Sequence, residues 1–303
     1  MNFITSEDKK YPKLLKKIGK DAPKKLYYKG VWEQEIFENC LAVVGSRQMT
    51  IYGKQVVEKI VSELASAGLT IVSGFMYGID ATSHKTTLRV GGKTIAVMPC
   101  GIDLIHPEYQ QGLYYEILSN NGLVISEYEG KMEPEYWTYP RRNRIVAGLS
   151  QAVLIIEAGE KSGSLITANW VKKFKRKVFV VPGPITSENS KGIMQLIKQG
   201  ATPISSAKDI LDYYKANFQF SISNFQSNTK LKIPSLDSPS RQGGQNPETT
   251  FEQKILEQLK RESLGVDELA RIFEISASQI GTILSMMQLR GLIKQEGVKY
   301  YVD

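Results

Sequence analysis

The sequence is poor in the residues on which catalysis, metal binding and disulfide formation depend. Its 303 residues include two cysteines, Cys40 and Cys100, and two histidines, His84 and His106. The cysteines lie far apart and form no CxxC pair, which predicts a reduced chain without a disulfide framework or a metal site. His84 falls on a predicted helix and His106 in a turn before a proline, so neither is expected to act as a catalytic base.

Long apolar runs and the common phosphate-binding motifs are also missing. No apolar run approaches the roughly 20 residues that a membrane span needs. The N-terminal sequence MNFITSEDKKYPKLLKK lacks the apolar core of a signal peptide. There is no GxxxxGK[ST] sequence, and GSRQMTIYG has the wrong spacing for GxGxxG. We therefore expect a cytoplasmic protein with no membrane segment, no cofactor and no enzymatic activity.

Basic residues exceed acidic ones, and the excess lies in the larger part of the chain. The net charge is +8 and the pI is about 9.2. From Phe251 to the C-terminus there are seven Lys and Arg and eight Asp and Glu, a net charge of −1. Residues 219–250 contain three Lys and Arg and two Asp and Glu, a net charge of +1. The whole excess of +8 is therefore carried by residues 1–218. Any electrostatic attraction to a polyanion is expected there.

Short β-branched segments alternate with amphipathic helical patterns over residues 41–214. Strands are expected over 41–45, 69–74, 93–98, 122–126, 151–158 and 176–183, and helices at about 52–67, 78–90 and 108–119. The strands are apolar throughout, which indicates a parallel sheet covered by helices on both faces. We predict an α/β domain with a doubly wound, mostly parallel sheet over residues 41–218, preceded by an N-terminal lead-in, residues 1–40.

The C-terminal part has a different composition. Residues 219–250 are rich in Ser, Asn, Gln, Pro and Gly, and we predict a flexible linker there. Residues 251–303 predict three helices, at about 251–261, after Gly265 and at about 276–290, followed by two strands joined at Glu296 and Gly297. This order is typical of a winged helix-turn-helix domain. Because its net charge is −1, we interpret it as a protein-interaction or dimer-modulating element.

Small and basic residues follow the predicted strands. In open parallel sheets ligands bind beyond the carboxyl ends of the strands, where glycines let the backbone approach and helix N-termini attract anions. Glycines at such positions also simply form tight turns, but several such loops at one edge favour an anion-binding cleft. The residues concerned are Gly45, Ser46, Arg47, Ser73, Gly74, Ser162, Gly163, Ser164 and Thr167.

The most basic short segment is YPRRNRIVAG, residues 139–148. Tyr139, Arg141, Arg142, Asn143 and Arg144 lie in it, with no acid nearby in sequence. Guanidinium groups bind phosphate bidentately, and the rings of Tyr139 and of the preceding Trp137 offer faces on which bases can stack. The opposing interpretation is that one or two arginines are buried and pair with acids near strand ends. We expect both interpretations to be partly correct.

The acids near strand ends and helix starts have a structural interpretation. They are Asp80, Asp103, Glu127 and Glu157. We expect all four to cap helices or to pair with the arginines.

Seven short motifs follow one another between residues 43 and 183: VVGSR, SGFMYGIDATSH, GGKTIAV, SEY, YPRRNRIVAGLS, EAGEKSGSLITA and VPG. In this order they resemble the DNA-processing protein A family, also called DprA or Smf. YPKLLKKIGKDAPKKLYYKG, which precedes them, resembles the lead-in of that family, so the likeness covers about residues 11–214. The C-terminal winged helix is also similar to one found in many members.

The resemblance implies an extended Rossmann-like fold without catalytic activity. Family members bind single-stranded DNA, help to load the recombinase RecA onto it during natural transformation, and are typically dimers joined through the Rossmann-like domain. The expected partners are therefore single-stranded DNA, RecA and a second copy of the chain. By this resemblance, the guanidinium of Arg47 would bind a phosphate group of the DNA. The residues expected to bind DNA are Gly45, Ser46, Arg47, Ser73, Gly74, Tyr139, Arg141, Arg142, Asn143, Arg144, Ser162, Gly163, Ser164 and Thr167.

One alternative function belongs to a different class. The same Rossmann-like superfamily contains nucleotide sensors and nucleotide-processing enzymes, and a cleft lined by Gly45, Ser73, Gly101 and Ser162 has room for a free nucleotide. The enzymes carry a PGGxGTxxE-type loop with a catalytic glutamate. In this chain the loop at the corresponding position is EAGEKSGSLITA, and no glutamate occurs in the helical turn that follows it. This absence disfavours nucleotide hydrolysis but leaves nucleotide binding open.

Overall fold

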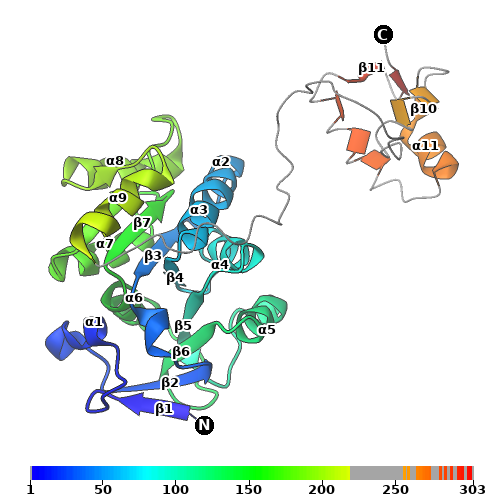
Figure 1. Ribbon diagram of the computed structural model, residues 1–303. Coiled ribbons are helices and arrows are strands. Elements are labelled where there is room, and N and C mark those ends of the chain that lie inside the picture. The colour runs from blue at the N-terminus through cyan, green and yellow to red at the C-terminus, as the bar shows by residue number, and fades with distance from the viewer. Residues whose placement is uncertain are drawn as a thin grey trace, which may run out of the picture. The chain divides into compact units, whose positions relative to one another are not determined.

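The chain divides into two units, Met1–Ile233 and Pro234–Asp303. The computed structural model describes residues 2–218 and, further on, 255–256, 258–259, 264–273, 280–281, 283–284, 287–288, 292–296 and 299–301 (Figure 1). The linker expected over 219–250 lies outside the described residues, as do parts of the helices expected at 251–261 and 276–290.

A twisted sheet forms the centre of the first unit (Figure 1). Within residues 2–218 it has nine strands in the order β1-β2-β6-β5-β4-β3-β7-β8-β9. Their bounds are β1 Asn2–Thr5, β2 Lys25–Gly30, β3 Cys40–Gly45, β4 Thr70–Ser73, β5 Thr94–Gly101, β6 Leu123–Tyr128, β7 Ala152–Ile156, β8 Lys177–Val180 and β9 Thr202–Pro203.

All pairings from β6 to β9 are parallel, and the strand order reverses at β3. β3 pairs with β4 on one side and with β7 on the other. This pair, β3 and β7, is the topological switch point of the sheet, where the loops after the two strands diverge and leave a crevice. The predicted α/β class and the mostly parallel sheet are confirmed.

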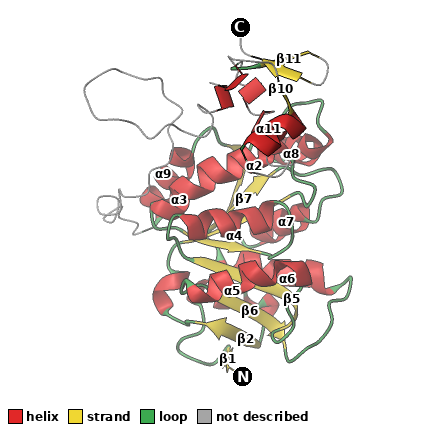
Figure 2. Cartoon of the chain, turned by 90° about the vertical axis from the view of Figure 1, so that its right-hand side faces the viewer, coloured by secondary structure: helices red, strands yellow, loops and turns green. Residues whose placement is uncertain are grey.

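Helices cover both faces of the sheet, as the fully apolar strands predicted. Their bounds are α1 Lys13–Lys16, α2 Ile51–Val56, α3 Ser62–Ser66, α4 Ile79–Arg89, α5 Gln111–Ser119, α6 Thr138–Leu149, α7 Ser164–Lys173, α8 Glu188–Lys198 and α9 Ala207–Asn217, and a π-helical turn, Val57–Val61, joins α2 to α3. Buried residues of α1, α6, α7 and α8 share one core with the sheet. Those of α3, α4, α5 and α9 lie in the cores on the other face. Figure 2 shows α3, α4 and α5 following one another across that second face.

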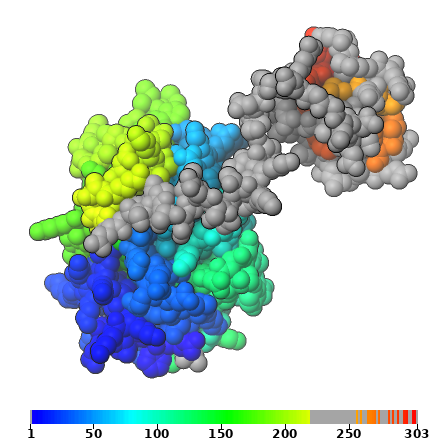
Figure 3. Space-filling model, viewed as in Figure 1, coloured from blue at the N-terminus to red at the C-terminus, as the bar shows by residue number. Residues whose placement is uncertain are grey.

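The N-terminal lead-in is more than a connection. β2 pairs antiparallel with β6, and β1 pairs antiparallel with β2, so both extend the sheet at one edge. In the space-filling view, the blue N-terminal residues are continuous with the body of the unit (Figure 3). The sequence interpretation missed both strands, because they are short and are recognisable only from the partner strand that they join.

The described part of the second unit holds α11, Val266–Ile272, and an antiparallel sheet in the order β10-β12-β11, with β10 Leu264–Gly265, β11 Lys294–Glu296 and β12 Lys299–Tyr301. The expected helix after Gly265 and the strand pair at the C-terminus are both present. A compact apolar core includes Leu269, Leu284, Ile293 and Tyr300.

Candidate functional site

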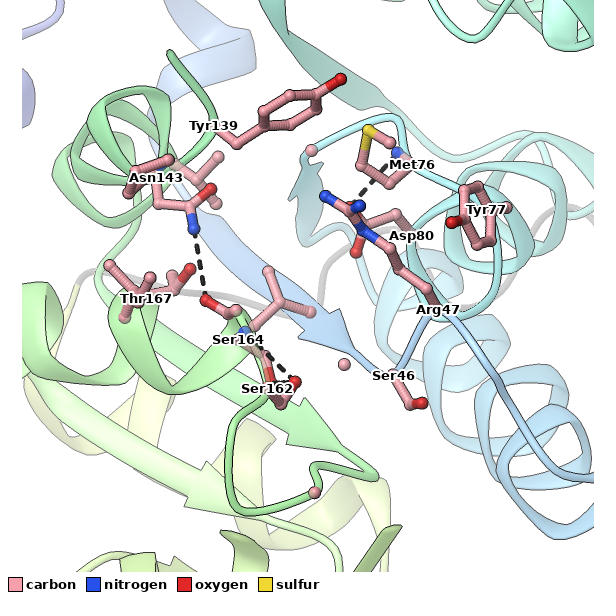
Figure 4. A pocket seen from close by; sticks show the side chains of 18 of the residues that line it. Ser46, Arg47, Met76, Tyr77, Asp80, Tyr139, Asn143, Ser162, Ser164 and Thr167 are labelled. Carbon is pink, nitrogen blue, oxygen red and sulfur yellow. Dashed lines mark hydrogen bonds between the residues drawn. The ribbon is translucent and has the colours of Figure 1, made fainter. Parts of the chain in front are cut away.

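A pocket of about 740 Å³ opens at the switch point of the sheet (Figure 4). Its walls come from the loops after β3, β4 and β7 and from the N-terminal turns of α6 and α7. We refer to it as the switch-point pocket. Of the residues expected from the sequence, it is lined by Gly45, Ser46, Arg47, Gly74, Tyr139, Arg142, Asn143, Ser162, Gly163, Ser164 and Thr167.

Gly45 allows β3 and β7 to meet at the base of the pocket. A Cβ atom at Gly45 would lie 1.8 Å from the carbonyl oxygen of Ile156 and 2.6 Å from Cγ1 of Ile79. The Ile156 carbonyl is backbone of β7, and Ile79 is a fully buried residue at the start of α4, so neither can easily move aside. The glycine is therefore required by strand packing, whatever the pocket binds.

The loop after β3 is held by the start of α8. Asn189 donates a hydrogen bond from Nδ2 to the carbonyl oxygen of Gln48 at 2.8 Å, and its Oδ1 accepts one from the Ser46 hydroxyl at 3.4 Å. These contacts fix the backbone from which the Arg47 side chain extends. The sequence interpretation missed Asn189, because it lies on another element, 143 residues from Ser46.

The loop after β7 is tied to the same region by Glu157. Its carboxylate accepts hydrogen bonds from the backbone N–H and the hydroxyl of Thr50, and Thr50 caps α2 by accepting a hydrogen bond from the Gly53 N–H at 3.1 Å. Glu157 has a φ of 56°, in the left-handed region that a non-glycine residue rarely adopts. The expected capping role of Glu157 is confirmed.

Arg142 and Asp80 form the buried floor of the pocket. The Arg142 side chain donates to the carbonyl oxygens of Gly74 and Val97 and is 3% exposed. Burial lowers the pKa of Arg142 to about 10, although the nearby Asp80 carboxylate raises it. Burial also raises the pKa of Asp80, against the lowering effect of Arg142. The buried cation and its acid therefore compensate each other inside the protein.

Gly74 is the point at which the backbone comes closest to this floor. A Cβ atom there would lie 2.5 Å from Nη2 of Arg142 and 2.7 Å from Oδ2 of Asp80. Asp80 also accepts a hydrogen bond from the Met76 N–H at 3.3 Å, which shapes the loop before α4. The expected structural role of Asp80 is thus confirmed, and Gly74 is needed for the same arrangement.

Arg47 extends across the pocket between two tyrosine rings (Figure 4). Its Cζ atom lies 5.2 Å from the ring centroid of Tyr139 and 5.7 Å from that of Tyr77. The side chain is exposed, and within the described part of the chain it forms no ion pair. The guanidinium is therefore positioned by aromatic faces while its donors remain free for an anion.

Tyr139 is itself held in place. Its hydroxyl lies 2.8 Å from Nε2 of His106, and burial lowers the pKa of His106. The phenol and the imidazole share a hydrogen bond. His106 thus orients an aromatic ring of the pocket, in keeping with the expectation that it is not a base.

The opposite wall is the N-terminal turn of α7. The hydroxyls of Ser162 and Ser164 lie 2.7 Å apart, and Asn143 donates from Nδ2 to the carbonyl oxygen of Gly163 at 3.3 Å. The exposed Lys161 adds a positive charge beside this turn. Hydroxyls, a lysine and a helix N-terminus on one wall, facing Arg47 on the other, form a setting suited to a phosphate.

Two arginines of the YPRRNR segment do not line the pocket, contrary to expectation. Arg144 is buried and donates from Nη2 to both carboxylate oxygens of Glu127, at 2.6 Å each, and from Nη1 to the carbonyl oxygen of Asp21 at 2.7 Å. Arg141 is exposed, but it pairs with the same Glu127 at 3.2 Å and lies over the Trp137 ring. The predicted pairing of Glu127 with arginines is confirmed. Arg144 is thus directed at protein groups, which accept three of its five N–H donors, and the residue is 7% exposed.

Ser73 is a further correction. It is fully buried, and its hydroxyl donates to the carbonyl oxygen of Val43 at 2.6 Å, which joins β4 to β3 below the pocket. His84 is fully buried as well, with Nδ1 2.7 Å from the Thr94 hydroxyl, so its expected packing role is confirmed. Asp103 pairs with Lys29 at 2.7 Å instead of with an arginine.

Aromatic residues that the sequence interpretation did not select complete the rim. Tyr77 and Tyr136 line the pocket, and the ring of the exposed Tyr109 lies 6.5 Å from that of Tyr77. Tyr136 is 97% exposed. Trp137 beside it, which the sequence did suggest as a stacking face, is 48% exposed. Solvated aromatic residues beside a cation are a signal that could have been noticed in the sequence at FMYG and EYWTYP.

Among the described residues, no helix is long and apolar enough to cross a membrane, and no group of His, Cys, Asp and Glu side chains is arranged to hold a metal ion.

Known proteins similar to this chain carry consistent names. A family model described as DNA recombination-mediator protein A matches residues 2–215, and one described as the DprA winged helix domain matches residues 239–297. Protein Smf of Synechocystis sp. is 34% identical over 98% of this chain and 79% of its own length.

Two solved structures are also similar. The crystal structure of DNA processing protein A from Streptococcus pneumoniae aligns with a TM-score of 0.65 and 37% identity, over 73% of this chain and 75% of that one. DNA processing protein A from Helicobacter pylori, whose structure was described for its single-stranded DNA binding mode, aligns with a TM-score of 0.63 and 32% identity. The alignment covers 72% of this chain and 98% of that one.

Proposed function

The chain belongs to the DNA recombination-mediator protein A family, and from this premise we propose that it binds single-stranded DNA in the switch-point pocket and acts as a recombination mediator, not as an enzyme. The observation that carries the proposal is Arg47. Its guanidinium is exposed, forms no ion pair among the described residues, and lies between the rings of Tyr77 and Tyr139. A free cation between aromatic faces fits a phosphate flanked by unstacked bases.

The rest of the pocket supports the same ligand. Lys161 and the N-terminal turn of α7 offer a second anion contact opposite Arg47. Asp80 is the acid that lines the pocket, and it is buried beside Arg142. Its charge is thereby compensated, so the pocket presents net positive charge to a polyanion.

The rim favours an unpaired strand over a duplex. Tyr77, Tyr109, Tyr136 and Trp137 are all exposed around the pocket or beside it. Bases in a duplex are already stacked on each other, whereas unpaired bases gain about 1–3 kcal/mol each by stacking on such rings. Binding is therefore tolerant of sequence and selective for single strands.

The arrangement of side chains does not favour catalysis. His84 is buried away from the pocket and His106 is occupied by Tyr139, so neither histidine is available as a general base. Ser162 and Ser164 hydrogen-bond each other. We propose that the protein, as a cytoplasmic homodimer joined through the Rossmann-like domain, protects incoming single strands and helps to load RecA onto them during DNA processing and natural transformation.

The test is a binding titration with oligothymidylate, measured by fluorescence anisotropy at several salt concentrations. Arg47→Ala should weaken binding by about 10- to 100-fold, the equivalent of the roughly 1.5–3 kcal/mol of a charge-assisted hydrogen bond. The slope of log affinity against log salt should fall by about 0.7 for each phosphate that the variant no longer neutralises. Arg89→Ala, at an exposed position of α4, removes the same charge elsewhere and should bind like the parent.

Two results would contradict the proposal. Equal binding by Arg47→Ala and the parent would remove Arg47 from the site. Complete displacement of the oligonucleotide by a mononucleotide at similar concentration would favour a free nucleotide as the ligand, which is the alternative that the pocket's position also allows.

A further inference from the structure

A second basic surface lies outside the switch-point pocket, where two lysine-rich segments meet. We call it the α1–α7 basic patch and define it by Lys13, Lys16, Lys17, Lys20, Lys172, Lys173 and Lys175. The chain has no acid between Asp8 and Asp21, or between Glu160 and Glu188. Two acid-free segments far apart in sequence thus contribute to one surface.

Contacts in the structure join the two segments. Arg176 donates from Nη2 to the carbonyl oxygen of Leu14 at 2.8 Å, and Lys173 pairs with Asp21 at 2.7 Å. α1 packs beside α6, which in turn packs on α7 (Figure 1). The lysines of residues 13–20 and those of residues 172–175 therefore lie on one face of the first unit.

Most of these lysines have no structural task. Lys13, Lys16, Lys17, Lys20 and Lys175 are exposed, and no ion pair in the described part of the chain involves them. The carboxylate at the edge of the patch, that of Asp21, already pairs with Lys173. Uncompensated positive charge of this density costs self-repulsion, which a bound polyanion would relieve.

The patch continues the switch-point pocket along one helix. α7 begins at Ser164, in the pocket wall, and ends at Lys173, in the patch. Its ten residues span about 15 Å. Partly buried rings of Trp170 and Phe174 stack in the patch at 5.6 Å, with Nζ of Lys173 4.4 Å from the Trp170 centroid. Basic groups interleaved with aromatic rings are typical of grooves for single-stranded nucleic acid.

We propose that the α1–α7 basic patch binds the phosphates of the single strand as it leaves the switch-point pocket, and so sets the length of DNA that one protomer holds. The inference rests on the proposed function, because it requires the pocket to hold a nucleotide of the same strand. It predicts that affinity depends on oligonucleotide length through the patch, and that short oligonucleotides are indifferent to it.

The experiment compares two triple variants of the full chain. Lys16→Gln/Lys17→Gln/Lys175→Gln removes three exposed charges from the patch. Lys54→Gln/Lys59→Gln/Lys85→Gln removes three exposed charges from α2, the π-helical turn and α4, on the other face of the sheet. Both variants have the same net charge, so a general electrostatic effect would weaken them equally. Circular dichroism checks that both fold.

Binding is measured with oligothymidylates of two lengths. One of about 6 nucleotides fills the pocket and lies within the usual footprint of one binding domain, and one of about 30 nucleotides extends beyond that footprint. For the longer one, the patch variant should bind about tenfold more weakly at low salt, with a salt slope smaller by about 2, since each neutralised phosphate contributes roughly 0.7. The control variant should match the parent. The shorter one should bind all three proteins alike.

Equal affinity of the two variants for the longer oligonucleotide would overturn the inference and leave the patch to another anionic partner, such as an acidic protein. Equal weakening at both lengths would also overturn it, because the patch would then not act beyond the pocket. If the parent binds neither length, the proposed function itself fails. The two failures are therefore distinguishable.

Discussion

Replacing Arg144 should destabilise the protein and leave the lining of the switch-point pocket unchanged, because Arg144 does not line it. Arg144 donates to both oxygens of Glu127 and to the carbonyl oxygen of Asp21, and the two side chains of the ion pair are 9% and 14% exposed. The contacts connect α6 to the end of β6 and to the N-terminal lead-in. Arg144→Met keeps the apolar stem and removes the charge.

The expected loss is about 3–5 kcal/mol in the free energy of unfolding, the range found when one partner of a buried ion pair is removed. Most of this arises because Glu127 keeps its charge while its main partner is gone. Arg141 also pairs with Glu127, but at 3.2 Å and from a half-exposed position, so it compensates only in part. The double variant Arg144→Met/Glu127→Met should recover much of the loss, since no uncompensated charge remains.

Tryptophan fluorescence during urea unfolding is a suitable assay. The three tryptophans, Trp32, Trp137 and Trp170, all lie in the first unit, so the signal reports on that unit within the full chain. The midpoint should fall in Arg144→Met and rise again in the double variant. Arg89→Met, at an exposed position of α4, is the matched control and should unfold like the parent.

The reasoning would be refuted by an Arg144→Met variant that is as stable as the parent. It would also be refuted if that variant, fully folded, lost oligothymidylate binding as strongly as Arg47→Ala. The first result would mean that the buried ion pair does not stabilise the fold. The second would mean that Arg144 turns outward and contacts the DNA, as the sequence interpretation allowed.

Two further predictions concern the core below the pocket. Gly45→Ala should lower the free energy of unfolding by at least about 1–3 kcal/mol, because the new Cβ atom would lie 1.8 Å from sheet backbone. Gly163→Ala is the control and should be tolerated, because no atom lies within 4 Å of the new Cβ atom. Equal urea midpoints for the two variants would disprove the clash. Burial lowers the pKa of His84 to about 3, so its contribution to stability is complete above its unfolded pKa near 6.5 and declines as the pH falls towards 3. Between pH 6 and 4.5 the free energy of unfolding of the parent should fall by about 1 kcal/mol per pH unit more than that of His84→Gln. If the two proteins show parallel profiles of stability against pH, the prediction is contradicted.

The alternation of apolar strands with amphipathic helices was enough to predict the sheet, its mostly parallel pairing and the edge at which ligands bind. Strands buried on both faces must be apolar throughout, so their pattern is local and readable. Small residues after β3 and β7 then indicated the pocket, because the carboxyl ends of parallel strands meet at one edge.

The division of roles among the arginines could not be predicted in this way. Arg141, Arg142 and Arg144 are neighbours in sequence, but their environments differ. Arg142 is buried against the carbonyl oxygens of Gly74 and Val97, whereas Arg144 from a buried position and Arg141 from an exposed one both pair with Glu127. Each partner lies on another strand or loop.

By itself, then, the sequence determined the fold class, the family and the edge of the sheet where the pocket opens, because these depend on local periodicity and on motifs. Only the tertiary structure decided that Arg47 forms no ion pair among the described residues while Arg142 and Arg144 are buried among protein acceptors. It also decided that lysines of residues 13–20 and 172–175 share one surface. Those facts depend on which distant groups come within hydrogen-bond distance, and that is fixed when the chain packs.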